Sequence, residues 1–137
     1  MRSTKTVSAI AVGAAVGSFA FLLESALVAT LPSPGRLGAW WSIAFLCAVA
    51  FATGITCGFV VDIFAGFPRR VVLSAAICAN ALIEGSVTAY LQMIAPEDVR
   101  STLFVASIST TVAHVLIFAI GAVLGYTLRR RASLSSG

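Results

Sequence analysis

Long apolar runs separated by short breaks dominate this chain. Four runs cover about residues 7–31, 39–66, 71–95 and 102–128. Each is at least as long as the roughly 20 residues that a helix needs to cross a bilayer core of about 30 Å. The breaks at residues 31–35, 66–68 and 96–98 each contain proline, which helix interiors exclude. The pattern predicts an all-α, polytopic membrane protein, with four transmembrane helices in a compact bundle and a single domain over residues 1–137.

Within two of these runs, polar residues recur at helical spacing. Asn80, Glu84, Thr88 and Gln92 are four residues apart, so they form one stripe on a helix. Ser107, Thr111 and His114 share a face of the fourth predicted helix, and this stripe is expected to oppose the first. Glu84 is thirteen residues into its run and His114 twelve into its own, which places both near the membrane midplane.

An ionisable side chain at that depth costs roughly 2.5–3.5 kcal/mol on insertion scales, so it faces the bundle interior, pairs or serves function. We predict an ion- or proton-binding site made by Glu84 and His114, with Glu24 contributing from the outer half of the first span. The same residues also fit a second interpretation, in which hydrogen bonds among them fix the packing of the helices. The polar lining of the site is predicted to be Asn80, Thr88, Gln92 and Thr111.

Glycines recur at a spacing typical of helix packing in membranes. The three pairs are Gly13 and Gly17, Gly54 and Gly58, and Gly121 and Gly125. Each pair forms a GxxxG motif, which allows two helix backbones to approach closely where lipid removes the hydrophobic driving force. We therefore predict tight helix–helix packing or a specific oligomer at these positions.

The composition supports a lipid environment, because 59% of the residues are hydrophobic and only 10% are charged, against about 25% charged in soluble domains. The net charge is +4, but the basic residues cluster at the ends of the apolar runs. Such positions anchor spans at the membrane surface, and nucleic acid is therefore not expected as a partner. The expected partners are the lipid bilayer and either further copies of the chain or other membrane subunits.

The distribution of Lys and Arg predicts the orientation. Seven lie on the side of the termini (Arg2, Lys5, Arg69, Arg70, Arg129, Arg130, Arg131) and two on the other (Arg36, Arg100). The positive-inside rule places both termini in the cytoplasm, with residues 129–137 as a basic cytoplasmic tail. Asp62 is expected to pair with Arg69 or Arg70 at that surface. We expect the membrane to be a bacterial plasma membrane.

The sequence shows no enzyme motif and indicates no cofactor. There is neither an HExxH sequence nor a phosphate-binding loop, and the short polar connections leave little aqueous domain for a soluble substrate. Cys47, Cys57 and Cys78 lie inside apolar runs without CxxC spacing, so we interpret them as packing residues and expect no metal. Haem ligation by two histidines would require a second copy or another subunit, because the chain has one histidine.

One short segment resembles a known family. The run over residues 58–68, with Gly58, Asp62 and Gly66 followed by Pro68, is similar to part of one membrane helix of the MreD family of cell-wall elongation scaffold proteins. Similar runs occur in the S components of vitamin transporters. The resemblance covers eleven residues and implies a scaffold role.

Two functions are therefore open from the sequence. The first is a small oligomeric transport protein, a proton- or cation-linked transporter or channel subunit, that uses the midplane Glu/His pair. The alternative is a non-catalytic accessory, scaffold or assembly subunit of a larger membrane complex.

Overall fold

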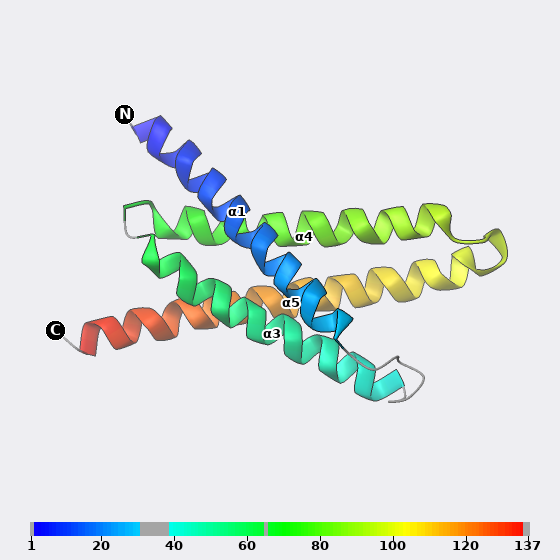
Figure 1. Cartoon of the computed structure of the whole chain (residues 1–137). Coiled ribbons are helices and arrows are strands. Elements are labelled where there is room, and N and C mark those ends of the chain that lie inside the picture. Colours follow the sequence, from blue (N-terminus) through cyan, green and yellow to red (C-terminus); the bar gives the residue numbers. More distant parts are fainter. Residues whose placement is uncertain (1, 31–38, 65, 136–137) are drawn as a thin grey trace.

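The computed structural model describes residues 2–30, 39–64 and 66–135, which form four helices and no strand. They are α1 (Arg2–Ala29), α3 (Ala39–Ile63), α4 (Arg69–Ile94) and α5 (Glu97–Ser135) (Figure 1). All four are long and apolar enough to cross a membrane. The all-α class with four membrane-length helices, predicted from the apolar runs, is confirmed.

The helix ends differ from the predicted spans by a few residues. The second run was expected to continue to residue 66, but α3 ends at Ile63, where the amides of Phe64 and Phe67 donate to turn carbonyls. Pro68 precedes α4, and its carbonyl accepts from the amides of Val71 and Val72. At the other end of the chain α5 continues to Ser135, so the basic segment is helical there. The predicted break at residues 31–35, Arg36 and residues 136–137 lie outside the described residues.

Successive helices run in opposite directions, so both termini and the α3–α4 connection lie at one end, here called the terminal end (Figure 1). The α4–α5 connection lies at the opposite end, here called the hairpin end. The most extensive packing is between α3 and α5 and between α1 and α4. In Figure 1, α1 crosses over α4 and α3 crosses over α5, and the chain is therefore built from two crossed pairs.

Close backbone contacts hold each crossed pair together. Between α3 and α5, a Cβ added to Gly58 would overlap the carbonyl oxygen of Ala122, and one added to Gly125 would overlap that of Ile55. Gly54 and Gly121 meet the opposite backbone in the same way. Glycine is therefore required at this crossing because the facing backbone occupies the space of a side chain.

The α1–α4 pair uses the same device on one side only. Gly13 lies against the backbone of Val72, and Gly17 lies against that of Ala76. The α4 surface here is built from small residues such as Ala75 and Ala76 in place of a second glycine pair. We refer to the six glycines of the two crossings as the glycine seams.

The buried apolar core lies between the terminal end and the middle of the bundle. It consists of small aliphatic side chains and one large ring: Ala9, Ala20, Ala50, Cys57, Val61, Val72, Leu73, Ala76, Phe118 and Ala122. Because Phe118 is 1% exposed and lies one turn from His114, it closes the interior on the terminal side of that histidine. The polar site begins where this core ends.

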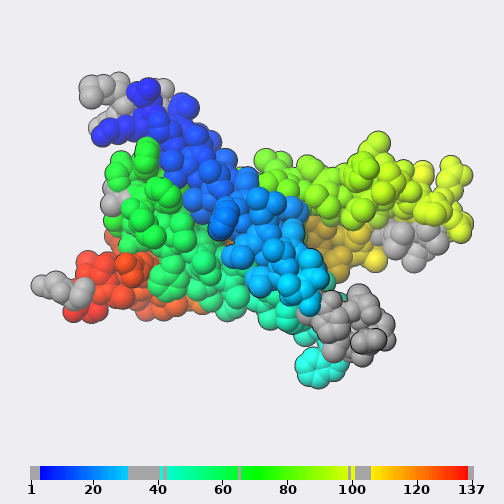
Figure 2. Space-filling view, viewed as in Figure 1, coloured from blue at the N-terminus to red at the C-terminus, as the bar shows by residue number. Residues whose placement is uncertain are grey.

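Toward the hairpin end, α4 and α5 project beyond α1 and α3 (Figure 2). Apolar side chains on this part of α4 are largely exposed: Val87, Tyr90, Leu91, Met93 and Ile94. In this region α4 and α5 rely mainly on each other.

Candidate functional site

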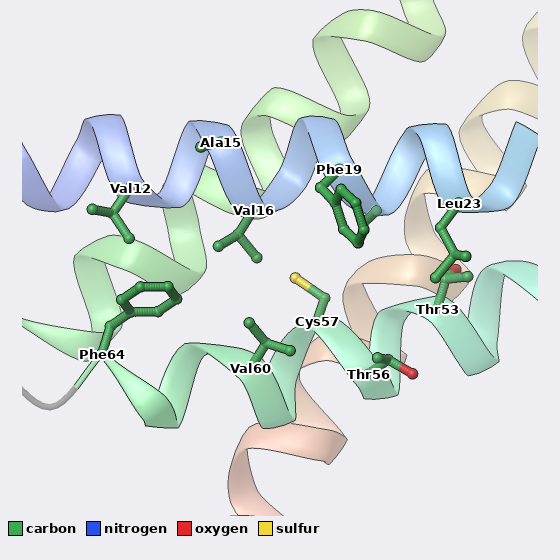
Figure 3. A pocket seen from close by; sticks show the side chains of 11 residues that line it. Val12, Ala15, Val16, Phe19, Leu23, Thr53, Thr56, Cys57, Val60 and Phe64 are labelled. Carbon is green, nitrogen blue, oxygen red and sulfur yellow. The ribbon is translucent and has the colours of Figure 1, made fainter.

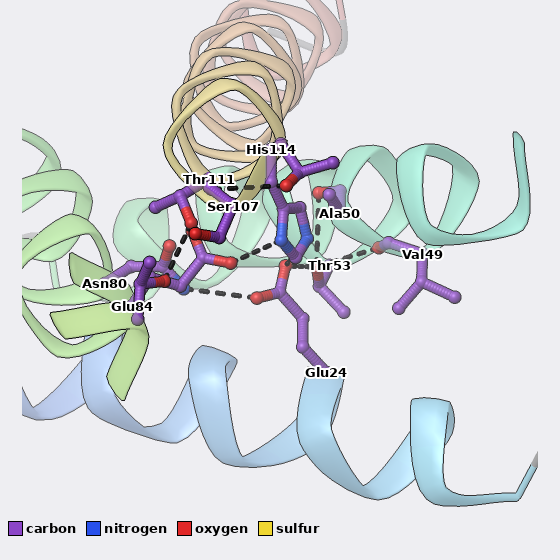
Figure 4. Close-up of polar contacts among 11 residues, drawn as sticks. Glu24, Val49, Ala50, Thr53, Asn80, Glu84, Ser107, Thr111 and His114 are labelled. Atoms are coloured by element: carbon purple, nitrogen blue, oxygen red, sulfur yellow. Dashed lines mark hydrogen bonds and ion pairs between the residues drawn. The ribbon is translucent and has the colours of Figure 1, made fainter. Parts of the chain in front are cut away.

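Five polar side chains from all four helices meet in the middle of the molecule. Glu24 comes from α1, Thr53 from α3, Asn80 and Glu84 from α4, and His114 from α5 (Figure 4). We call these residues the central cluster. In helices this apolar, the few polar side chains face one another because they would otherwise be buried without hydrogen-bond partners.

Glu24 is the most tightly held acid of the cluster, and it is only 3% exposed. The Thr53 hydroxyl donates to Glu24 Oε1 at 2.5 Å, and the Asn80 side-chain amide donates to Glu24 Oε2 at 3.3 Å. The two carboxyl oxygens thus bond to two different helices. This contact ties α1 to both α3 and α4 at one level.

The imidazole of His114 lies between the two glutamates. Its Nδ1 contacts Glu84 Oε1, and its Nε2 lies 3.8 Å from Glu24 Oε1 (Figure 4). Three buried atoms of the cluster have no hydrogen-bond partner among the described residues: His114 Nε2, Glu84 Oε2 and Asn80 Oδ1. The structure therefore brings Glu84 and His114 together and adds Glu24 to them, although the sequence placed Glu24 nearer the outer surface.

Two further polar pairs continue from the cluster toward the hairpin end. The hydroxyls of Thr88 and Thr111 are 2.7 Å apart, and the Gln92 amide donates to the Ser107 hydroxyl at 2.5 Å. These pairs, here called the polar ladder, join the α4 stripe to the α5 stripe. Each predicted lining residue, Asn80, Thr88, Gln92 and Thr111, thus has a polar contact inside the molecule.

A small cavity of about 130 Å³ opens beside the Glu84–His114 contact. This volume exceeds the roughly 30 Å³ that one water molecule takes up in the liquid. Its lining combines the two ionisable groups with threonines and apolar side chains: Ile43, Leu46, Cys47, Glu84, Thr110, Thr111, Ala113 and His114. Glu84 and His114 are 12% and 21% exposed, so the cavity offers them contact with small molecules.

A second, larger hollow is almost wholly apolar. Its volume is about 360 Å³, and it runs between α1 and α3, with Val16 and Phe19 on one side and Cys57 and Val60 on the other (Figure 3). Thr53 lines it as well, so this side chain separates the groove from Glu24. The groove presents no charged side chain among its described lining residues.

The charges at the terminal end form a separate group. Asp62 pairs with Arg69 at 3.0 Å and with Arg129 at 3.7 Å, whereas Arg70, Arg130 and Arg131 are exposed. Of the two predicted partners of Asp62, the structure selects Arg69, and it adds Arg129 from α5. This group lies beyond the apolar core and does not contact the central cluster.

Thr53 is the member of the cluster that the sequence analysis missed. It is one of two threonines in the middle of α3, and the other, Thr56, is exposed and bonds only within its own helix. The signal available in the sequence was the position of Thr53 directly before Gly54, on the packed side of α3. Choosing between the two requires knowing which face of α3 meets α1.

No protein-family model, no curated protein and no solved structure matches the chain. The resemblance of residues 58–68 to the MreD family therefore gains no support from these comparisons.

The residue types of the cluster, two carboxyl groups and an imidazole, are those that bind protons or small cations. With two ionised glutamates and a neutral imidazole its charge is −2, and two bound protons or monovalent cations neutralise it. Neutralisation is strongly favoured because an uncompensated charge is costly in a dry interior. In the part of the chain that the structure describes, no group of three or more His, Cys, Asp or Glu is arranged to hold a metal ion.

Proposed function

We propose that this protein is an integral membrane transport protein, a proton- or cation-linked transporter or channel subunit, and is not an enzyme. The observation that carries the proposal is the position of His114, which lies between Glu84 and Glu24 in the interior of four membrane-length helices. Ionisable groups at such a depth mark ion pathways and proton relays in membrane proteins. The cavity beside Glu84 supplies a route to the site.

The proposed setting is a bacterial plasma membrane with both termini in the cytoplasm. The paired and exposed arginines at the terminal end support this orientation, because basic residues collect at the cytoplasmic surface. Arg130 and Arg131 would then contact anionic headgroups, each contributing about 1 kcal/mol. The expected partners are lipid and further copies of the chain, because the described helices of one copy pack closely on the glycine seams and leave no wide pore between them.

The experiment is a flux measurement on the purified full chain in liposomes, with wild type compared with Glu84→Gln. The amide keeps the size of the side chain but carries no charge, so uptake of protons or Na⁺ is expected to fall by about tenfold or more. Glu97→Gln is the matched control, because Glu97 is exposed at the start of α5. Equal flux in wild type and Glu84→Gln would contradict the proposal.

A second candidate is a non-catalytic accessory, scaffold or assembly subunit. It is favoured by the exposed apolar side of α4 at the hairpin end, which α1 and α3 leave uncovered. In that case Glu84→Gln would leave no transport to lose and would instead weaken a complex. Native mass in mild detergent separates the two, because foreign bands in fixed proportion favour the subunit and a single repeating band favours the transporter.

A further inference from the structure

The Thr53 hydroxyl has several hydrogen-bond acceptors within reach. The Thr53 hydroxyl lies 2.5 Å from Glu24 Oε1 and also 2.8 Å from the carbonyl oxygen of Val49, one turn earlier in α3. A hydroxyl has one hydrogen to donate and two lone pairs that accept. It therefore donates to Glu24, to Val49 or to the carbonyl oxygen of Ala50, 3.1 Å away, at any one time.

This choice suits a carboxyl group that gains and loses a proton. When Glu24 is ionised, Thr53 donates to it. When Glu24 is protonated, its O–H donates to the Thr53 oxygen, and the threonine hydrogen turns to the Val49 carbonyl. Both forms of Glu24 are thus hydrogen-bonded without movement of a helix, which avoids the cost of an unpaired buried polar group, about 1–3 kcal/mol.

We propose that the cargo of this site is the proton, passed from Glu84 through the His114 ring to Glu24, with Thr53 as a positioning residue for both forms of Glu24. The inference rests on the proposed transport function and specifies its substrate. It also assigns Thr53, on α3, to a site otherwise made by α1, α4 and α5.

The transfer balances in protons and charge. A protonated Glu84 gives its proton to His114 Nδ1, and the proton on Nε2 passes to Glu24 Oε1. The products are an ionised Glu84, a protonated Glu24 and a neutral imidazole that carries its proton on Nδ1. The second step needs His114 Nε2 and Glu24 Oε1, now 3.8 Å apart, to approach by about 0.6–1 Å.

The surroundings fit a proton better than a metal or alkali cation. Hard cations take six or more oxygen ligands, and Na⁺ sites in transporters use backbone carbonyls of interrupted helices. Here α1, α3, α4 and α5 are continuous through the cluster, so their carbonyls remain in helical bonds. The groups around Glu24 are an imidazole, a hydroxyl and an amide donor, and an ammonium or guanidinium group is not among its described contacts.

The polar ladder and the cavity give the proton one route to Glu84. Thr88, Thr111, Gln92 and Ser107 extend from the cluster toward the hairpin end, and the cavity opens on the same side of the cluster. On the terminal side, Phe118 and the small apolar core pack next to the cluster, and the groove between α1 and α3 has no charged side chain among its described lining residues. Cys47, the remaining titratable group of the cavity lining, lies on the wall and has no polar contact to Glu24.

The experiment measures proton uptake into liposomes that hold a trapped pH-sensitive dye, driven by a K⁺ diffusion potential. Thr53→Val keeps the shape but removes the hydroxyl, so the rate is expected to fall by about tenfold or more. Thr53→Ser retains the hydroxyl and is expected to stay within about twofold of wild type, as is Thr56→Val, the matched control on the exposed side of α3. Unchanged uptake in folded Thr53→Val would overturn the role of Thr53.

A parallel measurement of Na⁺ uptake by the wild-type protein separates this inference from the proposed function. Wild type that carries Na⁺ at equal pH on both sides, and does not carry protons, would overturn the proton assignment and leave transport intact. Flux of neither ion would remove both proposals.

Infrared difference spectra supply a test that does not depend on the folding of Thr53→Val. A protonated carboxyl band that changes with pH in wild type and disappears in Glu24→Gln is expected. Its absence from wild type would contradict the two protonation states of Glu24.

Discussion

The terminal half and the hairpin half of this molecule hold their helices together by different means. In the terminal half, the glycine seams bring backbones into contact around a small apolar core. In the hairpin half, α4 and α5 are joined by polar pairs, Glu84–His114, Thr88–Thr111 and Gln92–Ser107. In the proposed membrane, lipid tails are as apolar as leucine, so these are the two main devices left for holding helices together.

The two kinds of contact also differ in the chemistry that they allow. Close backbone contact gives dense packing and leaves no polar group free to react, whereas polar pairs leave donors and acceptors that can exchange protons. The central cluster lies at the boundary, where the core ends at Phe118 and the polar side chains begin. The proposed proton site at this boundary therefore has an apolar side and a polar side.

The largest effect is expected from breaking a glycine seam. Gly58→Ala places a methyl group where the backbone of Ala122 lies, and we expect a loss of roughly 3 kcal/mol of unfolding free energy. Gly85→Ala is the matched control, because an added Cβ there meets nothing, and it should stabilise α4 by about 0.5–1 kcal/mol. Reversible unfolding in mixed detergent measures both. Equal stability of the two variants would show that the backbones of α3 and α5 are not in close contact at Gly58.

A smaller loss is expected at the boundary. Glu24→Ala leaves the buried Thr53 hydroxyl and Asn80 amide without their shared acceptor, and this should reduce stability by about 2 kcal/mol. Glu97→Ala, at an exposed position, should change it by less than about 1 kcal/mol. The same unfolding experiment compares them. A Glu24→Ala protein as stable as Glu97→Ala would mean that the cluster contributes nothing to packing.

Weaker still is the expected coupling across the polar ladder. A double-mutant cycle of Thr88→Val and Thr111→Val should give about 0.6 kcal/mol, the average for hydrogen bonds between membrane helices. Val matches Thr in shape, so the cycle isolates the hydroxyl pair. If this coupling energy exceeded the unfolding free energy lost in Gly58→Ala, the contrast between the two halves would be reversed.

The smallest effect is expected at the terminal surface. Arg129 is 54% exposed and lies 3.7 Å from Asp62, which also has Arg69 at 3.0 Å. Arg129→Gln should therefore change stability by less than about 0.5 kcal/mol, because exposed ion pairs contribute little. Thermal unfolding in detergent at low and high salt checks this. A large, salt-dependent loss would indicate that Asp62 depends on Arg129.

Much of the fold follows from the length, hydropathy and residue spacing of each apolar run. The length and hydropathy of the runs predict four helices, because an isolated apolar segment in lipid must satisfy its own backbone. The spacing of Asn80, Glu84, Thr88 and Gln92 places them on one face whatever surrounds the helix. Equal depth also made a meeting of Glu84 and His114 foreseeable, since helical rise converts residue number into height.

The lateral arrangement was decided only by the tertiary structure. Nothing in the spacing says that α1 crosses α4 while α3 crosses α5, because all four helices are similarly apolar and three carry GxxxG pairs. That arrangement brings Glu24 to His114 and turns Thr53, instead of Thr56, toward the cluster. Position along a helix is fixed by the sequence of that helix alone, whereas the neighbour it faces depends on how the surfaces of all four helices fit together.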